Sequence, residues 1–130
     1  MYGCPVDDLR GQLIGAWRVR RYDDRDSIAE EWGATYGPDV DGLIVYHDSG
    51  WLSVQITGSD GRLDGYFGRF EVVEMSARDG DIVGLLNHLI EASSMPELLL
   101  ADPARPFRVS GDTLVLGDET TWRRICERVG

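Results

Sequence analysis

One histidine and a small group of tyrosines and arginines are the residues of this 130-residue chain best suited to chemistry. His88 stands between Leu86 and Ile90 in a segment of alternating apolar residues, so it is predicted to face the interior of the fold. A buried histidine is either a core residue with hydrogen-bonded ring nitrogens, or a group that contacts a ligand or transfers a proton. Both interpretations of His88 remain open at this stage.

Aromatic residues are predicted on the same interior face of neighbouring strands. Tyr46, Tyr66 and Phe70 all fall on the inward side of the alternation. They could simply be core, or they could form the wall of a ligand cavity in which a tyrosine hydroxyl orients the ligand.

Arginines are predicted on the inward face of the C-terminal strands: Arg105, Arg124 and Arg128. A buried charge without a partner is costly, so each needs either an Asp or Glu at the rim or an anionic or carbonyl-bearing ligand. Arg21 follows Trp17 on the same alternation and is a further candidate for the ligand's counter-group.

The elements that must position these side chains are short strands. Gly, Asp and Ser punctuate the chain about every 8–12 residues, as in a sandwich or barrel. The predicted strands are Gly15–Asp24, Gly42–His47, Trp51–Thr57, Tyr66–Glu74, Ile82–Ala92, Phe107–Ser110, Thr113–Leu116 and Thr120–Val129. Weaker strand patterns cover Ile28–Trp32 and Leu98–Ala101, and helical spacing is found at Val6–Ile14. Leu85–Ile90 is also compatible with a helix.

The second hairpin has a register that can be derived from its turn. If Asp48–Gly50 forms a three-residue loop with Gly50 in the left-handed region, Tyr46 pairs with Leu52 and Ile44 with Val54. This register separates an apolar face from a polar one, whereas a two-residue turn would mix them.

Several segments, taken in order, resemble a known family. They include Gly15-Ala16-Trp17, Tyr36–Tyr46, Asp48–Gln55, Tyr66–Val72, Arg105–Leu114 and Glu127-Arg128-Val129. This set resembles the small bacterial and fungal lipocalin-like domain proteins, which have a calycin-type β-barrel. The resemblance implies a Gly-x-Trp motif that closes one end of the barrel, with a last-strand arginine, here Arg128 or Arg124, stacked on Trp17.

The fold class predicted from pattern and resemblance together is all-β. We expect residues 1–130 to form a single antiparallel lipocalin-like β-barrel of about eight to ten strands with a short N-terminal helix. The connection Asp23–Asp41, which contains Trp32 and Tyr36, is long enough to form a lid or Ω-loop over the open end.

The candidate site lies inside this barrel. The residues predicted to contact a ligand are Tyr46, Val54, Tyr66, Phe70, Leu86, His88, Arg105, Phe107 and Arg124. If the site is catalytic, the candidates are His88, Arg105 and Tyr46.

Composition excludes several other classes. The net charge is −10 with 13 arginines and no lysine, which argues against nucleic acid or an anionic membrane as partner and excludes a Schiff-base lysine. No His, Cys, Asp or Glu cluster has metal-ligand spacing, and nucleophile and dinucleotide motifs are absent. We therefore expect neither a metal nor a cofactor.

The N-terminal residues show no secretory signal, and no apolar run is long enough to span a membrane. Cys4 and Cys126 could form a disulfide, but reduced thiols in a cytoplasmic protein are favoured. A homodimer is compatible with the sequence.

The leading functional hypothesis is binding of a small, mostly apolar organic molecule inside the barrel. The alternative is a cofactor-independent cyclase or isomerase of secondary metabolism that acts on a natural-product intermediate. A filled barrel with a purely structural or interaction role is the third hypothesis. A cavity would argue against the filled barrel, and convergence of Arg or His beside a tyrosine hydroxyl would favour the enzyme.

Overall fold

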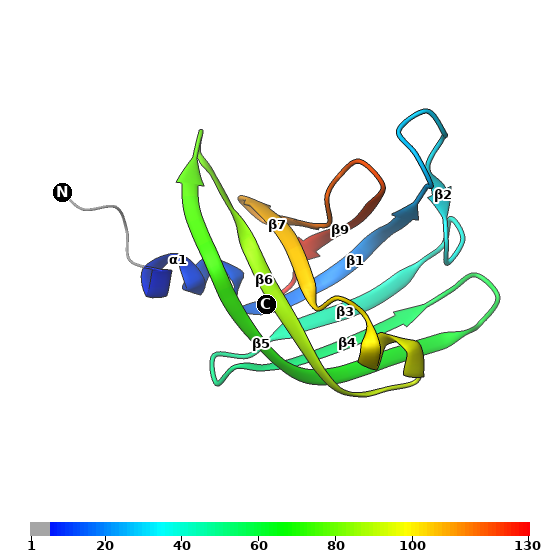
Figure 1. The fold of residues 1–130 in the computed structure, drawn as a ribbon, viewed down its shortest axis with the longest axis horizontal. Coiled ribbons are helices and arrows are strands. Elements are labelled where there is room, and N and C mark those ends of the chain that lie inside the picture. Colours follow the sequence, from blue (N-terminus) through cyan, green and yellow to red (C-terminus); the bar gives the residue numbers. More distant parts are fainter. Residues whose placement is uncertain (1–5) are drawn as a thin grey trace.

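The chain folds into a closed antiparallel barrel, seen in a computed structural model that describes residues 6–130 (Figure 1). The barrel strands are β1 (Gly15–Asp24), β3 (Asp41–Tyr46), β4 (Trp51–Thr57), β5 (Leu63–Arg78), β6 (Asp81–Ser93), β7 (Ala104–Ser110), β8 (Thr113–Leu116) and β9 (Trp122–Arg128). Each pairs with the next, and β9 returns to pair with β1, so eight strands close the sheet. The predicted all-β antiparallel barrel is confirmed.

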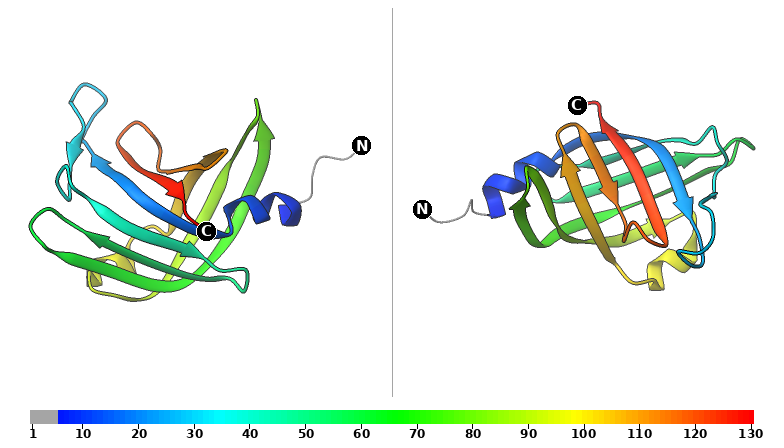
Figure 2. Two further views of the ribbon diagram at one scale, coloured as in Figure 1. Left: turned by 180° about the vertical axis from the view of Figure 1, so that it is seen from behind. Right: turned by 90° about the horizontal axis from the view of Figure 1, so that it is seen from above.

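Three short elements lie outside this cylinder. Helix α1 (Val6–Leu13) is at one end of the barrel, and the 3₁₀ helix η1 (Pro96–Leu100) is at the other (Figures 1 and 2). Strand β2 (Gly33–Ala34) pairs with the end of β1. Within residues 6–130, no helix has both the length and the apolar character required to cross a membrane.

Both weaker strand predictions are wrong. Leu98–Ala101 belongs largely to η1. Pro96 lies at the start of this helix, where the backbone N–H that proline lacks would have no partner within the helix. Ile28–Trp32 forms no strand; only Gly33–Ala34, just after it, pairs with β1. The alternative of a helix at Leu85–Ile90 is also wrong, because this segment is part of β6: it pairs with β5 along its length and, from Leu85 to Asn87, with β7 as well.

The hairpin between β3 and β4 has the predicted register. Tyr46 pairs with Leu52 and Ile44 with Val54, and Gly50 has a φ of +96°, in the left-handed region. The turn residues therefore determine which side chains of both strands enter the barrel.

The end of the barrel next to α1 is closed by Trp17. The fully buried indole donates a hydrogen bond from Nε1 to the carbonyl oxygen of Leu13 at 2.9 Å. The guanidinium carbon of Arg128 lies 4.2 Å from the centre of the Trp17 ring. The predicted stacking of a last-strand arginine on this tryptophan is confirmed for Arg128.

A β-bulge in β1 changes the interior face beyond Val19. Val19 pairs with Cys126 and Arg21 with Ile125, so Arg20 is an extra residue in the ladder. The inward position that alternation assigned to Arg21 therefore passes to Tyr22. The prediction that Arg21 faces the interior as a counter-group for the ligand is wrong: its side chain is exposed and pairs with Asp23 at 2.9 Å.

Cys126 is a fully buried core residue, and burial raises the pKa of its thiol to about 12. Cys4, with which a disulfide was possible but not favoured, lies outside the described residues.

Candidate ligand-binding site

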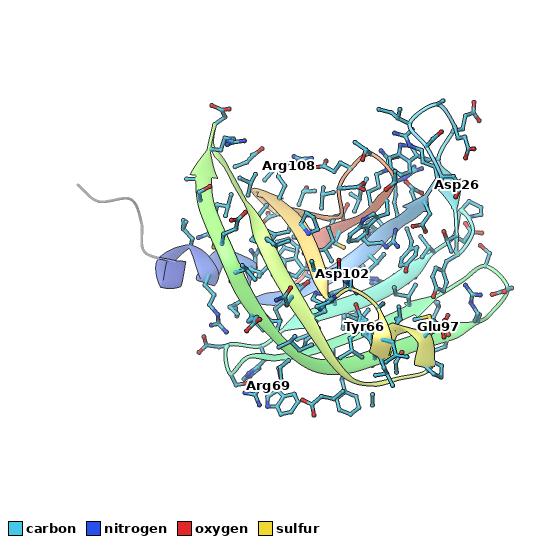
Figure 3. The ribbon with its side chains drawn as sticks, in the orientation of Figure 1. Asp26, Tyr66, Arg69, Glu97, Asp102 and Arg108 are labelled. Carbon is cyan, nitrogen blue, oxygen red and sulfur yellow. The ribbon has the colours of Figure 1, made fainter. Side chains whose placement is uncertain are left out.

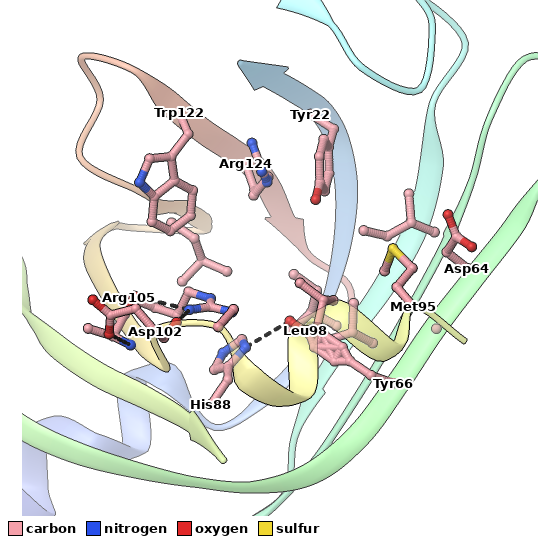
Figure 4. Close-up of a pocket in the computed structure, with 17 residues that line it drawn as sticks. Tyr22, Asp64, Tyr66, His88, Met95, Leu98, Asp102, Arg105, Trp122 and Arg124 are labelled. Atoms are coloured by element: carbon pink, nitrogen blue, oxygen red, sulfur yellow. Dashed lines mark hydrogen bonds between the residues drawn. The ribbon is translucent and has the colours of Figure 1, made fainter. Parts of the chain in front are cut away.

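A cavity of about 360 Å³ lies between the packed interior and η1 (Figure 4). Its apolar lining consists of Ile44, Val54, Ile56, Gly65, Met95, Leu98, Ala101, Ala104, Leu116 and Trp122. Its polar lining consists of Tyr22, Asp64, Tyr66, His88, Asp102, Arg105 and Arg124. The volume falls within the range of about 300–1,000 Å³ of small-molecule sites.

The predicted ligand-binding residues divide into two groups. Those that line the cavity are Val54, Tyr66, His88, Arg105 and Arg124. Those that are packed in the core without lining it are Tyr46, Phe70, Leu86 and Phe107. The second group belongs to the buried core, together with Trp17, and the cavity lies toward η1.

His88 is held between two tyrosine hydroxyls. Its Nε2 shares a hydrogen bond with the Tyr46 hydroxyl at 2.7 Å, and its Nδ1 shares one with the Tyr66 hydroxyl at 2.9 Å. The three residues come from β6, β3 and β5, and β5 pairs Phe70 opposite His88. The closed sheet therefore brings together side chains that are distant in sequence.

The protonation states of these residues follow from burial. Burial lowers the pKa of His88 well below its ordinary value of 6.5, and the charge of Arg105 lowers it further, so the imidazole is neutral. Burial raises the pKa of Tyr46 well above 10.0 and that of Tyr66 to about 12, so both hydroxyls keep their protons at neutral pH. The site is thus a chain of three neutral hydrogen-bonding groups next to a cation.

That cation is Arg105, which sits at the start of β7. Its Nη1 donates to the backbone carbonyls of Asp102 at 2.7 Å and Ala104 at 3.1 Å. Among residues 6–130, no carboxylate forms a salt bridge with Arg105. Figure 4 shows Tyr66, His88 and Arg105 gathered at one side of the cavity.

The second arginine of the cavity has its charge balanced by the protein. Arg124 donates from Nη2 to Asp24 Oδ1 at 3.1 Å and from Nη1 to the carbonyl of Asp23 at 2.9 Å. Its guanidinium carbon also lies 3.4 Å from the centre of the Tyr22 ring. Arg124 is therefore a fixed part of the wall opposite His88.

Sequence reasoning missed several lining residues. Tyr22 was hidden by the bulge, although two consecutive arginines, Arg20 and Arg21, interrupt the alternation and are a signal for it. Leu98 was missed because Leu98–Ala101 was interpreted as a weak strand, and Met95 lies outside every predicted element. Pro96, just before that segment, was the available signal, because proline is common at the first position of a helix.

The long connection after β1 contributes to the rim through Tyr36. This buried ring packs edge-on against Tyr22 at 4.7 Å between centroids, and its hydroxyl donates to Asp64 Oδ2 at 2.7 Å. Trp32 lies instead between Arg25 and Arg123. Tyr36 thus supports Tyr22 and Asp64, which line the cavity.

The polar residues at the surface of the sheet are separate from this site. Figure 3 shows Tyr66 beside η1, on the interior side of the sheet, and Arg69 on the exterior side. Arg69 stacks on Trp51 at 4.6 Å. Within the part of the chain that the structure describes, no group of three His, Cys, Asp or Glu side chains is arranged to hold a metal ion.

Comparison with known proteins gives no match to a family model, to a curated protein or to a solved structure. The closed eight-stranded antiparallel barrel is consistent with a lipocalin-like or calycin fold. The site must therefore be interpreted from its own geometry.

Proposed function

We propose that this protein binds one small, mostly apolar organic molecule in the cavity beneath η1. The observation that carries the proposal is the cavity of about 360 Å³, with aliphatic side chains on its walls and with Tyr66, His88 and Arg105 gathered at one side. A barrel whose role was only structural would have no need to leave this volume unfilled, because close packing stabilises a core.

The lining matches the general pattern of small-molecule sites. Ile44, Val54 and Ile56 provide an apolar wall, while Tyr66 and Arg105 provide a few directed donors. Apolar contact contributes affinity and the directed donors fix the orientation of the ligand. The resemblance to lipocalin-like domain proteins is in keeping with this proposal.

The test is uptake of a neutral fluorescent probe, N-phenyl-1-naphthylamine, whose emission rises in an apolar environment. We expect saturable binding that Ile56→Trp weakens by about tenfold or more, because the larger ring occupies the cavity. The matched control is Thr57→Trp, which adds the same ring at the neighbouring exposed position of β4 and should bind like the wild type. Absence of saturable uptake, or equal binding by both variants, would contradict the proposal.

A cofactor-independent cyclase or isomerase is the second candidate, and one observation favours it. His88 and Arg105 converge beside the Tyr66 hydroxyl, which is the arrangement expected of a site that polarises a carbonyl group. Such a site would hold a flexible substrate in a reactive conformation, and positioning can supply up to about 7–11 kcal/mol of a barrier.

This candidate is tested by proton exchange in a simple ketone. A site that polarises a carbonyl should accelerate exchange of the α-protons of 4-phenyl-2-butanone with D₂O, followed by NMR, and Tyr66→Phe should slow it. Exchange at the rate of buffer alone would leave the binding function as the better proposal.

A further inference from the structure

The direction of the hydrogen bonds through His88 follows from the position of Tyr46. Tyr46 is completely buried, and within residues 6–130 its hydroxyl has a single hydrogen-bond partner, His88 Nε2 at 2.7 Å. A buried O–H without an acceptor is costly. The Tyr46 hydroxyl must therefore donate to Nε2.

The direction of the Tyr46 hydrogen bond determines the direction of the other hydrogen bonds through His88. Neutral His88 has one N–H, and since Nε2 accepts, the proton is on Nδ1 and is donated to the Tyr66 hydroxyl oxygen at 2.9 Å. The Tyr66 O–H is then left to donate elsewhere, and Tyr66 lines the cavity. The Tyr66 hydroxyl is a stronger donor for accepting this bond, because hydrogen bonds in a chain polarise one another.

Arg105 supplies the charge at the same place. Figure 4 shows Arg105 close to His88 and on the same side of the cavity as Tyr66, and its positive charge adds to the lowering of the His88 pKa by burial. Unlike Arg124, which has Asp24, it has no carboxylate partner among the described residues. A neutral carbonyl would satisfy Tyr66, but only an anion would also pair with the charge of Arg105.

We propose that the ligand is a small organic monocarboxylate, whose carboxylate pairs with Arg105 and accepts the Tyr66 O–H, while its apolar body lies along Ile44 and Ile56. This proposal rests on the binding function proposed above and adds the chemical class of the ligand. Tyr46 and His88 act as positioning residues, because they direct the Tyr66 proton without touching the carboxylate.

The ligand class is tested by displacement of N-phenyl-1-naphthylamine with 4-phenylbutyrate and with its uncharged amide. We expect the acid to bind at least about tenfold more tightly than the amide, as for a charge-assisted hydrogen bond. Arg105→Gln should abolish this preference, and Tyr66→Phe should weaken binding of the acid. Arg78→Gln, the control, removes the same charge from an exposed position of β5 and should keep the preference.

The direction of the hydrogen bonds through His88 is tested by NMR of the histidine ring nitrogens, with His47→Gln used to assign the signals. We expect His88 to carry its proton on Nδ1 in the wild type. In Tyr46→Phe, which removes the hydrogen bond to Nε2, we expect the proton to redistribute toward Nε2 and the preference for the acid to fall. A proton on Nε2 in the wild type would overturn the positioning role of Tyr46.

The outcomes separate this proposal from the proposed function. If the probe and the amide bind but the acid binds no better, the binding function stands and the carboxylate proposal is wrong. If the preference survives in Arg105→Gln as it does in Arg78→Gln, the carboxylate proposal is also wrong. If the probe, the acid (tested directly by calorimetry) and the amide all fail to bind, both proposals fall.

Discussion

The two ends of the barrel use the same types of residue to opposite effect. At the end next to α1, Arg128 stacks on Trp17 and donates to the backbone carbonyls of Ile14, at 3.0 Å, and Gln12. At the end next to η1, Arg105 uses Nη1 for two backbone carbonyls and faces a cavity. One arginine completes a packed structure, and the other borders a space that the chain does not fill.

Strand alternation predicts both arginines on the inward face, so the two positions differ only in the groups that surround each guanidinium. Gly15, with a φ of +135°, brings the C-terminal backbone close: a Cβ there would collide with the carbonyl oxygen of Gly130. The closed end therefore depends on a close contact between backbone segments, which only a glycine at position 15 allows. The open end has η1 over it, and none of the residues of η1 is buried.

The largest effect should come from Trp17→Ala at the closed end. Removing a fully buried indole should lower the free energy of unfolding by about 3–5 kcal/mol, measured by denaturant titration. Trp122→Ala, which removes an indole from the cavity wall where the ring is only partly buried, should cost less than Trp17→Ala. Equal losses for the two variants would contradict the distinction between a packed end and an open one.

Arg128→Met should have the next largest effect. The substitution keeps much of the apolar stem but leaves the carbonyls of Gln12 and Ile14 without their donor, which should cost about 1.5–3 kcal/mol of stability. The expected signature is a fall in melting temperature with probe binding retained at the other end. An unchanged melting temperature would show that Arg128 does not lock this end.

A pH dependence should originate at the open end. Because the pKa of folded His88 is well below 6.5, the unfolded chain binds a proton that the folded chain does not. Stability should therefore decrease as pH falls below about 6.5, with a slope approaching 1.4 kcal/mol per pH unit until the folded pKa is reached. In His88→Gln this slope should be absent between about pH 6 and 5, where carboxylates contribute little. A wild-type slope in the variant would assign the effect to another group.

Arg105→Met should have the smallest effect on stability, within about 0.5 kcal/mol of the wild type. The side chain has no salt bridge to lose among the described residues, and the two carbonyls it contacts are near the exposed Asp102. Measured beside Arg128→Met, it tests the comparison directly. A loss as large as that of Arg128→Met would mean that Arg105 is structural.

Much of the fold could be predicted because its determinants are local. Asp48–Gly50 has the composition of a three-residue hairpin loop, and that loop alone sets the register of β3 against β4. Strand limits such as Gly15–Asp24 and Thr113–Leu116 follow from the alternation and from the turn residues that flank them. The stacking of Arg128 on Trp17 was expected from the resemblance, and closure of β9 onto β1 provides it.

The errors arose where alternation is interrupted. Because Arg20 is an extra residue in β1, Tyr22 and not Arg21 points to the interior. The inward or outward direction of side chains beyond a bulge cannot be predicted without knowing where the bulge lies. The leucines of η1 resemble a strand in composition, but they do not alternate against a partner. Both errors fall on the walls of the cavity.

The sequence by itself determined the class of fold, the face of each regular strand and the inward direction of His88, Tyr46 and Tyr66, because these depend on period and turn chemistry along a few residues. Only the tertiary structure decided which half of the interior is packed and which is left open. It also decided that His88 meets tyrosines 42 and 22 residues away along the chain. Such contacts depend on how the whole sheet closes, and the placement of Arg105 beside an unfilled space depends on it in the same way.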